Sequence, residues 1–260
     1  MGLVGVLRHP IGTLVGLRFE HRRWTLAKRH IAGDGIEIGA LHRPLRIPVN
    51  ARVRYVDRYD VAGLRREYPE LGDLRLVPVD VIDDGETLAT LTDASVDFVV
   101  ANHFIEHTQD PLATLRNHLR VLREWGMIFL AVPDKRRSFD SEREVTPLAH
   151  VLRDFAEGPQ WSREEHFREW VVSVDKAEDV EARAAELSDA DYSIHFHVWT
   201  PAAFTELLEH ARDVLGMPFS IEEIRANGAE FIVILRRGAE PAAGAAAATA
   251  PVRAAADARA

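Results

Sequence analysis

SVDFVVANHFIEHTQDPLATLRNHLRVLREWGMIFLAVPD, residues 95–134, contains in order a strand, a polar turn, a helix and a second strand. Residues 96–101 are apolar except for one aspartate, which is typical of a strand covered on both faces. Asp110 and Pro111 suit the cap and first turn of a helix, whose apolar positions recur at helical spacing: Leu112, Leu115, Leu119 and Leu122. Gly126 is expected to end this helix, before a second apolar strand at 127–132. A strand–helix–strand unit of this length predicts a right-handed parallel crossover.

Similar alternation extends over most of the chain. Three further strands are predicted at residues 35–38, 53–56 and 74–77, with a short helix at 61–68. A helix is expected at 201–215, and two strand-like runs at 219–225 and 230–236 flank a turn. This turn contains Asn227 and Gly228, a pair that strongly favours a hairpin. We therefore expect an α/β fold with a doubly wound, mostly parallel seven-stranded sheet and a terminal antiparallel hairpin.

The region between the parallel strands and the last helix is charged and rich in aromatic residues and histidine. It contains WSREEHFREW (161–170), a charged helix near 175–187 and DYSIHFHVW (191–199). We interpret it as a lid inserted over the carboxyl edge of the sheet. The expected organisation is an N-terminal helical cap (1–32), a cofactor-binding half (33–135), the lid (136–199), the last helix with the closing hairpin (200–237) and a disordered Ala-rich tail (238–260).

Composition restricts the class of function. The 260 residues carry a net charge of -9, which argues against nucleic acid as the main partner. The absence of cysteine excludes disulfides and thiolate metal sites. No apolar run is long enough to insert stably in a membrane, and the N-terminus has no signal-peptide cleavage pattern. A cytoplasmic protein with a small-molecule partner is the expectation.

Acidic residues follow the predicted strands at the edge where doubly wound folds bind ligands. Glycine at position 39, after the first strand, lets a ligand approach the backbone. Asp57, after the second strand, is placed to accept hydrogen bonds from a ribose diol. Asp80, after the third, could accept a hydrogen bond from an exocyclic amine. Together they predict a nucleoside-type site.

The order GIEIGA (35–40), VRYVD (53–57), VPVD (77–80) and the long block at 96–134 resembles a class I S-adenosylmethionine-dependent methyltransferase. The most specific part is the block from Asn102 to Gly126, with Glu106-His107-x-x-Asp110-Pro111 at its core. The overall similarity is to members associated with polysaccharide and glycoside biosynthesis. The resemblance implies a Rossmann-like sheet and S-adenosyl-L-methionine as the cofactor.

The resemblance also implies roles for individual residues. It places Glu37, Gly39 and Ala40 in the cofactor loop, Asp57 at the ribose hydroxyls, Asp80 near the adenine, and Asn102 and His103 at the methionine side. The chain departs from the family pattern because it keeps only one glycine of that loop. Leu41 stands where the family has another glycine, so its side chain must point away from the cofactor or cover it.

Methyl transfer to a hydroxyl benefits from a general base, and histidine titrates near neutrality. The candidates for catalysis are His166, His195 and His197, with His103 and His107 as further possibilities. His195 and His197 alternate on a strand-like segment, which predicts that both rings point to one side. The other interpretation is that these histidines are structural and hydrogen-bonded beneath the lid.

The lid also raises the questions of the acceptor and of a metal. Its aromatic side chains suit a saccharide acceptor or form the lid's own core: Trp161, Trp170, Tyr192, Phe196 and Trp199. His195-x-His197 with Glu164, Glu165 or His166 could hold a divalent ion, whereas Mg²⁺ would prefer the oxygens of Asp134, Asp140 or Glu165. The spacing matches no zinc signature, so we predict no metal ligand and leave Mg²⁺ open.

The predicted function is therefore transfer of a methyl group to a sugar or another small hydroxyl acceptor. Two alternatives stay open. A nicotinamide-dependent oxidoreductase would also use an acidic residue after the second strand, although G-x-G-x-x-G is missing. A non-catalytic methyltransferase-like protein would explain the glycine-poor loop.

Overall fold

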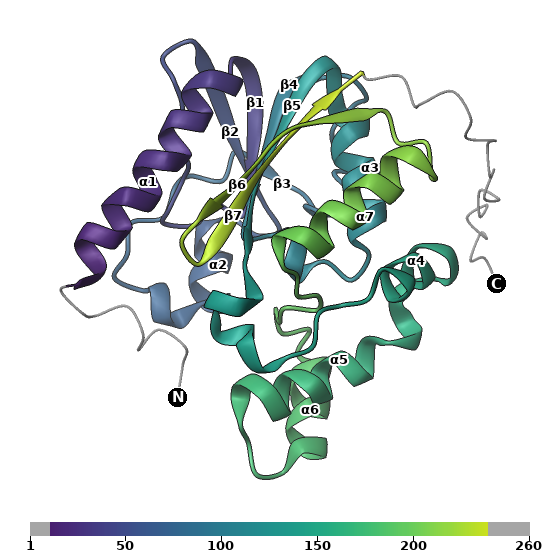
Figure 1. Ribbon diagram of the computed structural model, residues 1–260. Coiled ribbons are helices and arrows are strands. Elements are labelled where there is room, and N and C mark those ends of the chain that lie inside the picture. The colour runs from purple at the N-terminus through teal and green to yellow at the C-terminus, as the bar shows by residue number, and fades with distance from the viewer. Residues whose placement is uncertain (1–10, 239–260) are drawn as a thin grey trace, which may run out of the picture.

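The computed structural model describes residues 11–238, so the predictions for the first ten residues and for the tail beyond Gly238 lie outside it. Seven strands form one sheet in the order β3-β2-β1-β4-β5-β7-β6 (Figure 1). The strands are β1 (Gly33–Ile38), β2 (Ala51–Asp57), β3 (Val81–Ile82), β4 (Val96–Asn102), β5 (Leu122–Pro133), β6 (Phe219–Asn227) and β7 (Glu230–Arg237). The first five strands pair in parallel, and β7 pairs antiparallel with both β5 and β6. The predicted doubly wound α/β sheet with a terminal hairpin is confirmed.

Residues 11–238 contain seven α-helices, of which α5 and α6 lie in the lobe below the sheet and not against it (Figure 1). They are α1 (Ile11–His30), α2 (Val61–Glu67), α3 (Pro111–Val121), α4 (Leu148–Glu157), α5 (Arg163–Trp170), α6 (Val180–Asp189) and α7 (Pro201–Asp213). Asp110 caps α3 by accepting a hydrogen bond from the N–H of Ala113 (2.9 Å), and Thr200 caps α7 in the same way. Among the described residues, no helix is both long and apolar enough to cross a membrane.

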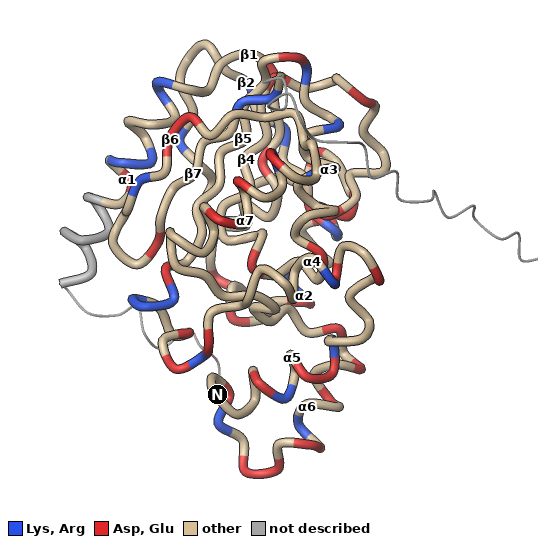
Figure 2. The backbone as a smooth tube through the Cα atoms, turned by 45° about the vertical axis from the view of Figure 1, so that its right-hand side comes forward, with Lys and Arg blue, Asp and Glu red and all other residues tan. Residues whose placement is uncertain are grey.

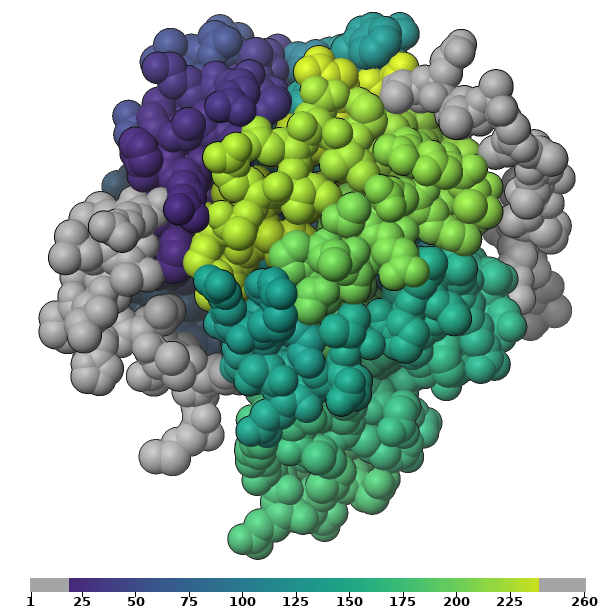
Figure 3. Space-filling model, in the orientation of Figure 1, coloured from purple at the N-terminus to yellow at the C-terminus, as the bar shows by residue number. Residues whose placement is uncertain are grey.

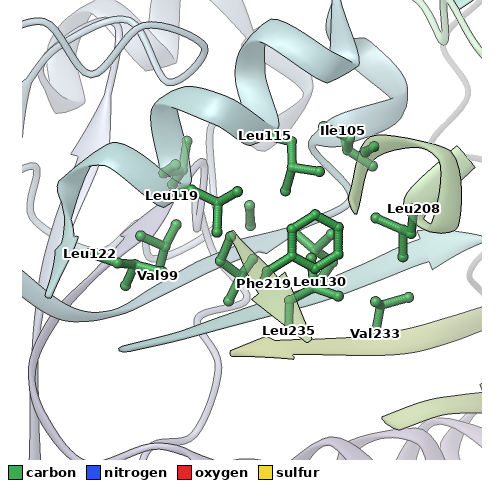
Figure 4. Packing of buried hydrophobic residues seen from close by; sticks show 14 of the residues in the cluster. Val99, Ile105, Leu115, Leu119, Leu122, Leu130, Leu208, Phe219, Val233 and Leu235 are labelled. Carbon is green, nitrogen blue, oxygen red and sulfur yellow. The ribbon is translucent and has the colours of Figure 1, made fainter. Parts of the chain in front are cut away.

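The central strands are buried on both faces because their side chains alternate between two cores. Phe98 and Val100 of β4 pack toward Leu26 and Ala27 of α1, whereas Val99 faces the opposite core. That second core lies between the sheet and helices α3 and α7 (Figure 4). The continuous apolar runs of β4 and β5 therefore follow from burial on both sides of the sheet.

The third strand lies later in the chain than predicted. Residues 74–77 form no strand: the N–H of Val77 donates to the carbonyl of Leu41 (2.8 Å), and Leu76 packs into a small cluster beside α2. Pro78 has no N–H to donate to a ladder. Pairing with β2 begins only after it, where Val81 lies opposite Val56.

Gly126 does not end the helix, contrary to the sequence prediction. α3 ends at Val121, and Gly126 lies inside β5, next to a shift in the register with β4. A Cβ atom at Gly126 would lie 2.9 Å from the carbonyl oxygen of Arg123 and 3.0 Å from that of Asp97. Glycine is therefore required by the close approach of two backbones and not by a helix cap.

The lid leaves the sheet at the carboxyl end of β5 and returns at Trp199, which forms a bridge with Asp134. It forms the lower lobe of the molecule in Figures 1 and 3. α5 and α6 enclose a core of their own, made of Phe167, Trp170, Val171, Ala184, Leu187, Ile194 and Phe196. The charged helix predicted at 175–187 begins later, at Val180, and the segment 192–198 is extended without joining the sheet.

α1 lies against one face of the sheet and reaches the closing hairpin. Arg23 binds Glu230 at the start of β7 through two hydrogen bonds of 2.8 and 2.5 Å. The aromatic ring of Phe19 lies directly against Gly228, where an added Cβ would overlap the edge of the ring. Figure 2 shows mainly basic residues along the described part of α1 and charges of both signs on α5 and α6.

Candidate functional site

The loop after β1 leaves its backbone open at Gly39. This residue has φ +64°, and an added Cβ would find only Phe104, 4.0 Å away, so a ligand can approach the backbone here. Leu41 also has a positive φ (48°), and its side chain packs against the cluster of Leu64, Leu71 and Leu76. This packing favours the first of the two predicted orientations, in which the side chain points away from the cofactor.

The carboxyl group of Glu37 holds this loop by a hydrogen bond to its backbone. Its side chain is buried, and Oε1 accepts a hydrogen bond from the N–H of Leu45 (2.8 Å), while Oε2 is buried without a partner. Burial raises the pKa of Glu37 to about 7. Ala40 follows the open glycine and is 9% exposed. Glu37 thus fixes the loop through its hydrogen bond with Leu45, and its second carboxyl oxygen stays unpaired.

Asp57 ends β2 at the carboxyl edge, as predicted. Its Oδ1 accepts a hydrogen bond from the N–H of Arg58 (2.8 Å), and burial raises its pKa to about 6. A half-buried carboxylate at this place can accept two hydrogen bonds from a diol.

Asp80 was predicted to follow the third strand, but it precedes β3 and lies beside Tyr55. The N–H of Tyr55 donates to Oδ2 of Asp80 (2.8 Å), and the N–H of Asp80 donates to the carbonyl of Tyr55 (2.9 Å). Asp83 follows β3 instead, but its carboxylate already accepts hydrogen bonds from Ala89 and from Thr90. The geometry does not bring Asp80 to the carboxyl edge, and its adenine role gains no support.

Asn102 and His103 lie at the end of β4, as predicted. Both amide atoms of Asn102 are buried without a partner. His103 has φ +51°, and its Nε2 lies 2.8 Å from Glu230, while Nδ1 is 3.5 Å from Glu106. Burial lowers the pKa of His103, but the two carboxylates outweigh it and raise the pKa to about 9. The carboxyl edge therefore combines a cationic imidazolium with an unpaired amide.

Glu106, His107 and His195 form a buried group just beyond this edge, with one potential ligand atom from each within 4.8 Å of the others. Both oxygens of Glu106 are buried without a hydrogen-bond partner. Nδ1 of His107 contacts the carbonyl of Ile194 (2.8 Å) in the returning segment of the lid, and not a partner inside the Glu106 turn. Nδ1 of His195 contacts Oδ2 of Asp140 (2.8 Å), and this contact fixes the orientation of the imidazole ring.

His166 and His197 belong to a second group, together with His150 and Asp154 of α4. His195 and His197 were predicted to act on one side of a strand, but they enter two neighbouring clusters. The reason is that segment 192–198 crosses between the lid core and the main core without pairing in the sheet. His150 and Asp154 were missed by the sequence analysis, although their i, i+4 spacing places both on one helix face.

The lid aromatics divide between packing and exposure. Trp170 and Phe196 belong to the lid core, as the structural interpretation predicted, whereas Trp199 belongs to the main core, the one between the sheet and helices α3 and α7. Trp161 and Tyr192 are 42% and 43% exposed. Phe139, which the sequence analysis did not single out, is 46% exposed and its ring centroid lies 4.7 Å from that of His195.

The sequence and the fold of this chain were compared with those of known proteins. Residues 33–211 match the family model of a methyltransferase domain. The chain is similar in fold to a SAM-dependent methyltransferase from Aquifex aeolicus, with 13% identity, a TM-score of 0.47 and coverage of 85% of this chain and 92% of that one. It is also similar to a SAM-dependent methyltransferase from Thermotoga maritima, with 16% identity, a TM-score of 0.44 and coverage of 86% and 99%. No curated protein matches the chain.

Proposed function

Because this chain belongs to the methyltransferase-domain family, we propose that it transfers a methyl group from S-adenosylmethionine to a hydroxyl of a saccharide or another small acceptor. The single observation that carries the hydroxyl assignment is the Asp140–His195 contact of 2.8 Å beside the carboxyl edge. A carboxylate that accepts from Nδ1 of a histidine leaves Nε2 free to accept a proton.

The residues at the edge fit the proposed cofactor. The open backbone at Gly39 and the carboxylate of Asp57 match the needs of an amino-acid chain and a ribose diol. The unpaired amide of Asn102 and the cation of His103 offer a donor, an acceptor and a positive charge at the methionine side. The cofactor supplies an electrophilic methyl group on a sulfonium, and the chain has to position an acceptor in line with it.

His195 is the residue that we assign as general base. Asp140 holds its ring, and Arg143 in turn binds Asp140 (3.0 Å), so the imidazole is oriented from behind. The exposed ring of Phe139 lies beside it and could stack on the apolar face of a sugar. A proton leaving the acceptor hydroxyl would pass to Nε2 of His195. The lid, which contributes both Asp140 and His195, would exclude water from the reaction.

The first test is a calorimetric titration with S-adenosylhomocysteine, with and without Mg²⁺. Micromolar or tighter binding supports the cofactor assignment, whereas no binding in either condition would favour the non-catalytic alternative. A parallel titration with nicotinamide cofactors tests the oxidoreductase alternative, against which the family match already counts.

The second test addresses the base. In an acceptor screen that begins with sugars, His195→Gln should lower kcat by about 10²–10⁴-fold, the usual contribution of a general base, with unchanged affinity for S-adenosylhomocysteine. His210→Gln, on α7, is the matched histidine control. Full activity of His195→Gln would remove this residue from catalysis.

A further inference from the structure

Four side chains converge in the interior between the lid and the sheet: His150, Asp154, His166 and His197. One potential ligand atom from each lies within 4.8 Å of all the others. Asp154 and His197 are fully buried, and His166 is 8% exposed. The lining therefore consists of three imidazoles and one carboxylate, of which only His150 is partly exposed, and it is not a solvated acidic cluster.

The distances between these donor atoms resemble those of a tetrahedral ion site. Nε2 of His150 lies 3.0 Å from Nε2 of His166 and 3.3 Å from Oδ2 of Asp154. Nε2 of His197 lies 3.8 Å from the same oxygen and 3.3 Å from the carbonyl oxygen of Gln109, so binding an ion through this nitrogen would exchange the contact with Gln109 for the metal bond. Zinc bonds of about 2.0–2.2 Å to nitrogen and oxygen put tetrahedral ligand atoms roughly 3.3–3.6 Å apart. Small adjustments of the side chains would therefore bring the four donors to one ion.

An unpaired polar atom of this cluster also favours a cation. Oδ2 of Asp154 is buried without a hydrogen-bond partner. A buried, unsatisfied carboxylate oxygen among three imidazoles is expensive to bury unless a cation binds it.

The surroundings do not oppose a dication. Arg143 is the basic side chain whose positive charge acts on both His166 and His197. This charge is already balanced by ion pairs with Asp140 and with Glu169 (2.9 Å). Oδ1 of Asp154 accepts a hydrogen bond from Ser162 (3.1 Å), which fixes the carboxylate so that Oδ2 points to the histidines. Oriented ligands of this kind are usual in metal sites.

We propose that His150, Asp154, His166 and His197 bind one Zn²⁺ ion that fastens the lid to the methyltransferase core. Three nitrogen ligands favour zinc or another late first-row ion over Mg²⁺ and Ca²⁺, which prefer oxygen. Four protein ligands fill a tetrahedral shell, so the ion is structural and not catalytic. This role goes beyond the proposed methyl transfer and gives His166 and His197 a function other than that of a base.

The positions of the ligands explain what the ion would accomplish. α4 carries two ligands and packs on the main core through Val151, whereas α5 carries His166 and contributes Phe167 to the lid core. His197 lies on the returning segment, and its N–H donates to the carbonyl of Glu106 (3.2 Å). A single ion would thus connect both cores with the segment that carries His195.

The test measures metal content and not activity. Untagged protein from zinc-replete medium should contain about one zinc per chain by mass spectrometry. Zinc affinity should fall by more than about 100-fold in His150→Gln and in His166→Gln, because a lost ligand costs more than the 10–100-fold typical of a lost supporting contact. His150 is partly exposed, so this variant is the one least disturbed in folding.

Two controls locate the ion. His210→Gln should keep its zinc, because His210 lies on α7 outside the cluster. His195→Gln should also keep it. Loss of zinc from His195→Gln together with retention in His166→Gln would move the ion to Glu106, His107 and His195 and overturn the proposal.

A further experiment uses only wild-type protein, so that it remains informative if the variants fail to fold. Wild-type protein stripped by a chelator should have a lower Tm that one equivalent of Zn²⁺ restores, and Co²⁺ should give the visible absorption of a tetrahedral site. Absence of zinc from the purified protein and no binding to the stripped chain would refute the site. Cofactor binding is measured separately, so that failure of one proposal leaves the other intact.

Discussion

Asp57 is the residue whose position connects the fold most directly to the cofactor. A hydrogen-bonded carboxylate contributes about 1.5–3 kcal/mol, so Asp57→Ala should weaken S-adenosylhomocysteine binding roughly 10–150-fold by calorimetry. Because burial raises its pKa to about 6, the carboxylate is lost as pH falls through that value, and the affinity should fall with it.

Asp80→Asn is the matched control for Asp57. The side-chain carbonyl of asparagine can still accept the hydrogen bond from Tyr55, and Asp80 precedes β3. The affinity of this variant for S-adenosylhomocysteine should match that of the wild type. Equal weakening in the two variants would show that Asp80 also contributes to cofactor binding, as the resemblance to the family implies.

His103 is the residue with the most distinctive titration. Its C–H proton resonances should follow a pKa of about 9, because Glu106 and Glu230 face the ring. The raised pKa contributes stability that is fully present below about 6.5 and is lost as pH rises through about 9. Glu230→Gln should move the titration toward 6.5 in an NMR experiment, and an unmoved value would exclude this pairing.

At the scale of elements, a helix or strand could be predicted from the sequence where the pattern that specifies it lies within a short stretch of residues. β4, β5 and the hairpin carry long apolar runs or an Asn-Gly turn, so their existence follows from short stretches of sequence. β3 has only two paired residues, and its place depends on Pro78 and on contacts with β2 that are distant in sequence. The cluster of His150, His166 and His197 could not be predicted for the same reason, because these residues are distant in sequence and meet only through tertiary packing.

Gly126 tests the close approach of β4 and β5. A methyl group at this position would press on two carbonyl oxygens, of Arg123 and Asp97, that belong to the sheet itself. Gly126→Ala should lower the free energy of unfolding by about 1–3 kcal/mol, the usual cost of overpacking, as measured by urea denaturation. Gly216→Ala, where an added Cβ meets nothing within 4 Å, should cost only the strain of its φ of +70°; equal losses would show that crowding at Gly126 is relieved.

At the scale of the whole molecule, the lid has an apolar core of its own, separate from the two cores that flank the sheet. The main sheet is packed on both faces, whereas the lid encloses a small core between α5, α6 and the segment before Trp199. The lid leaves and rejoins the sheet at adjacent points, Asp134 and Trp199. Units with few buried contacts open at lower free energy than the global transition. Lid and sheet should therefore differ in stability, although they form one continuous chain.

Phe167 and Phe129 allow this difference to be measured, since both rings are buried and each lies in a different interior. Phe→Ala in a core costs about 3–5 kcal/mol. Phe167→Ala should accelerate amide hydrogen exchange in α5 and α6 and leave β4 and β5 protected, as detected by mass spectrometry of peptides. Phe129→Ala should instead accelerate exchange in the sheet and lower the free energy of the cooperative unfolding of the molecule. If Phe167→Ala accelerated exchange equally in β4 and β5, the lid would unfold only together with the sheet, and a lid that opens and closes independently over the acceptor would be excluded.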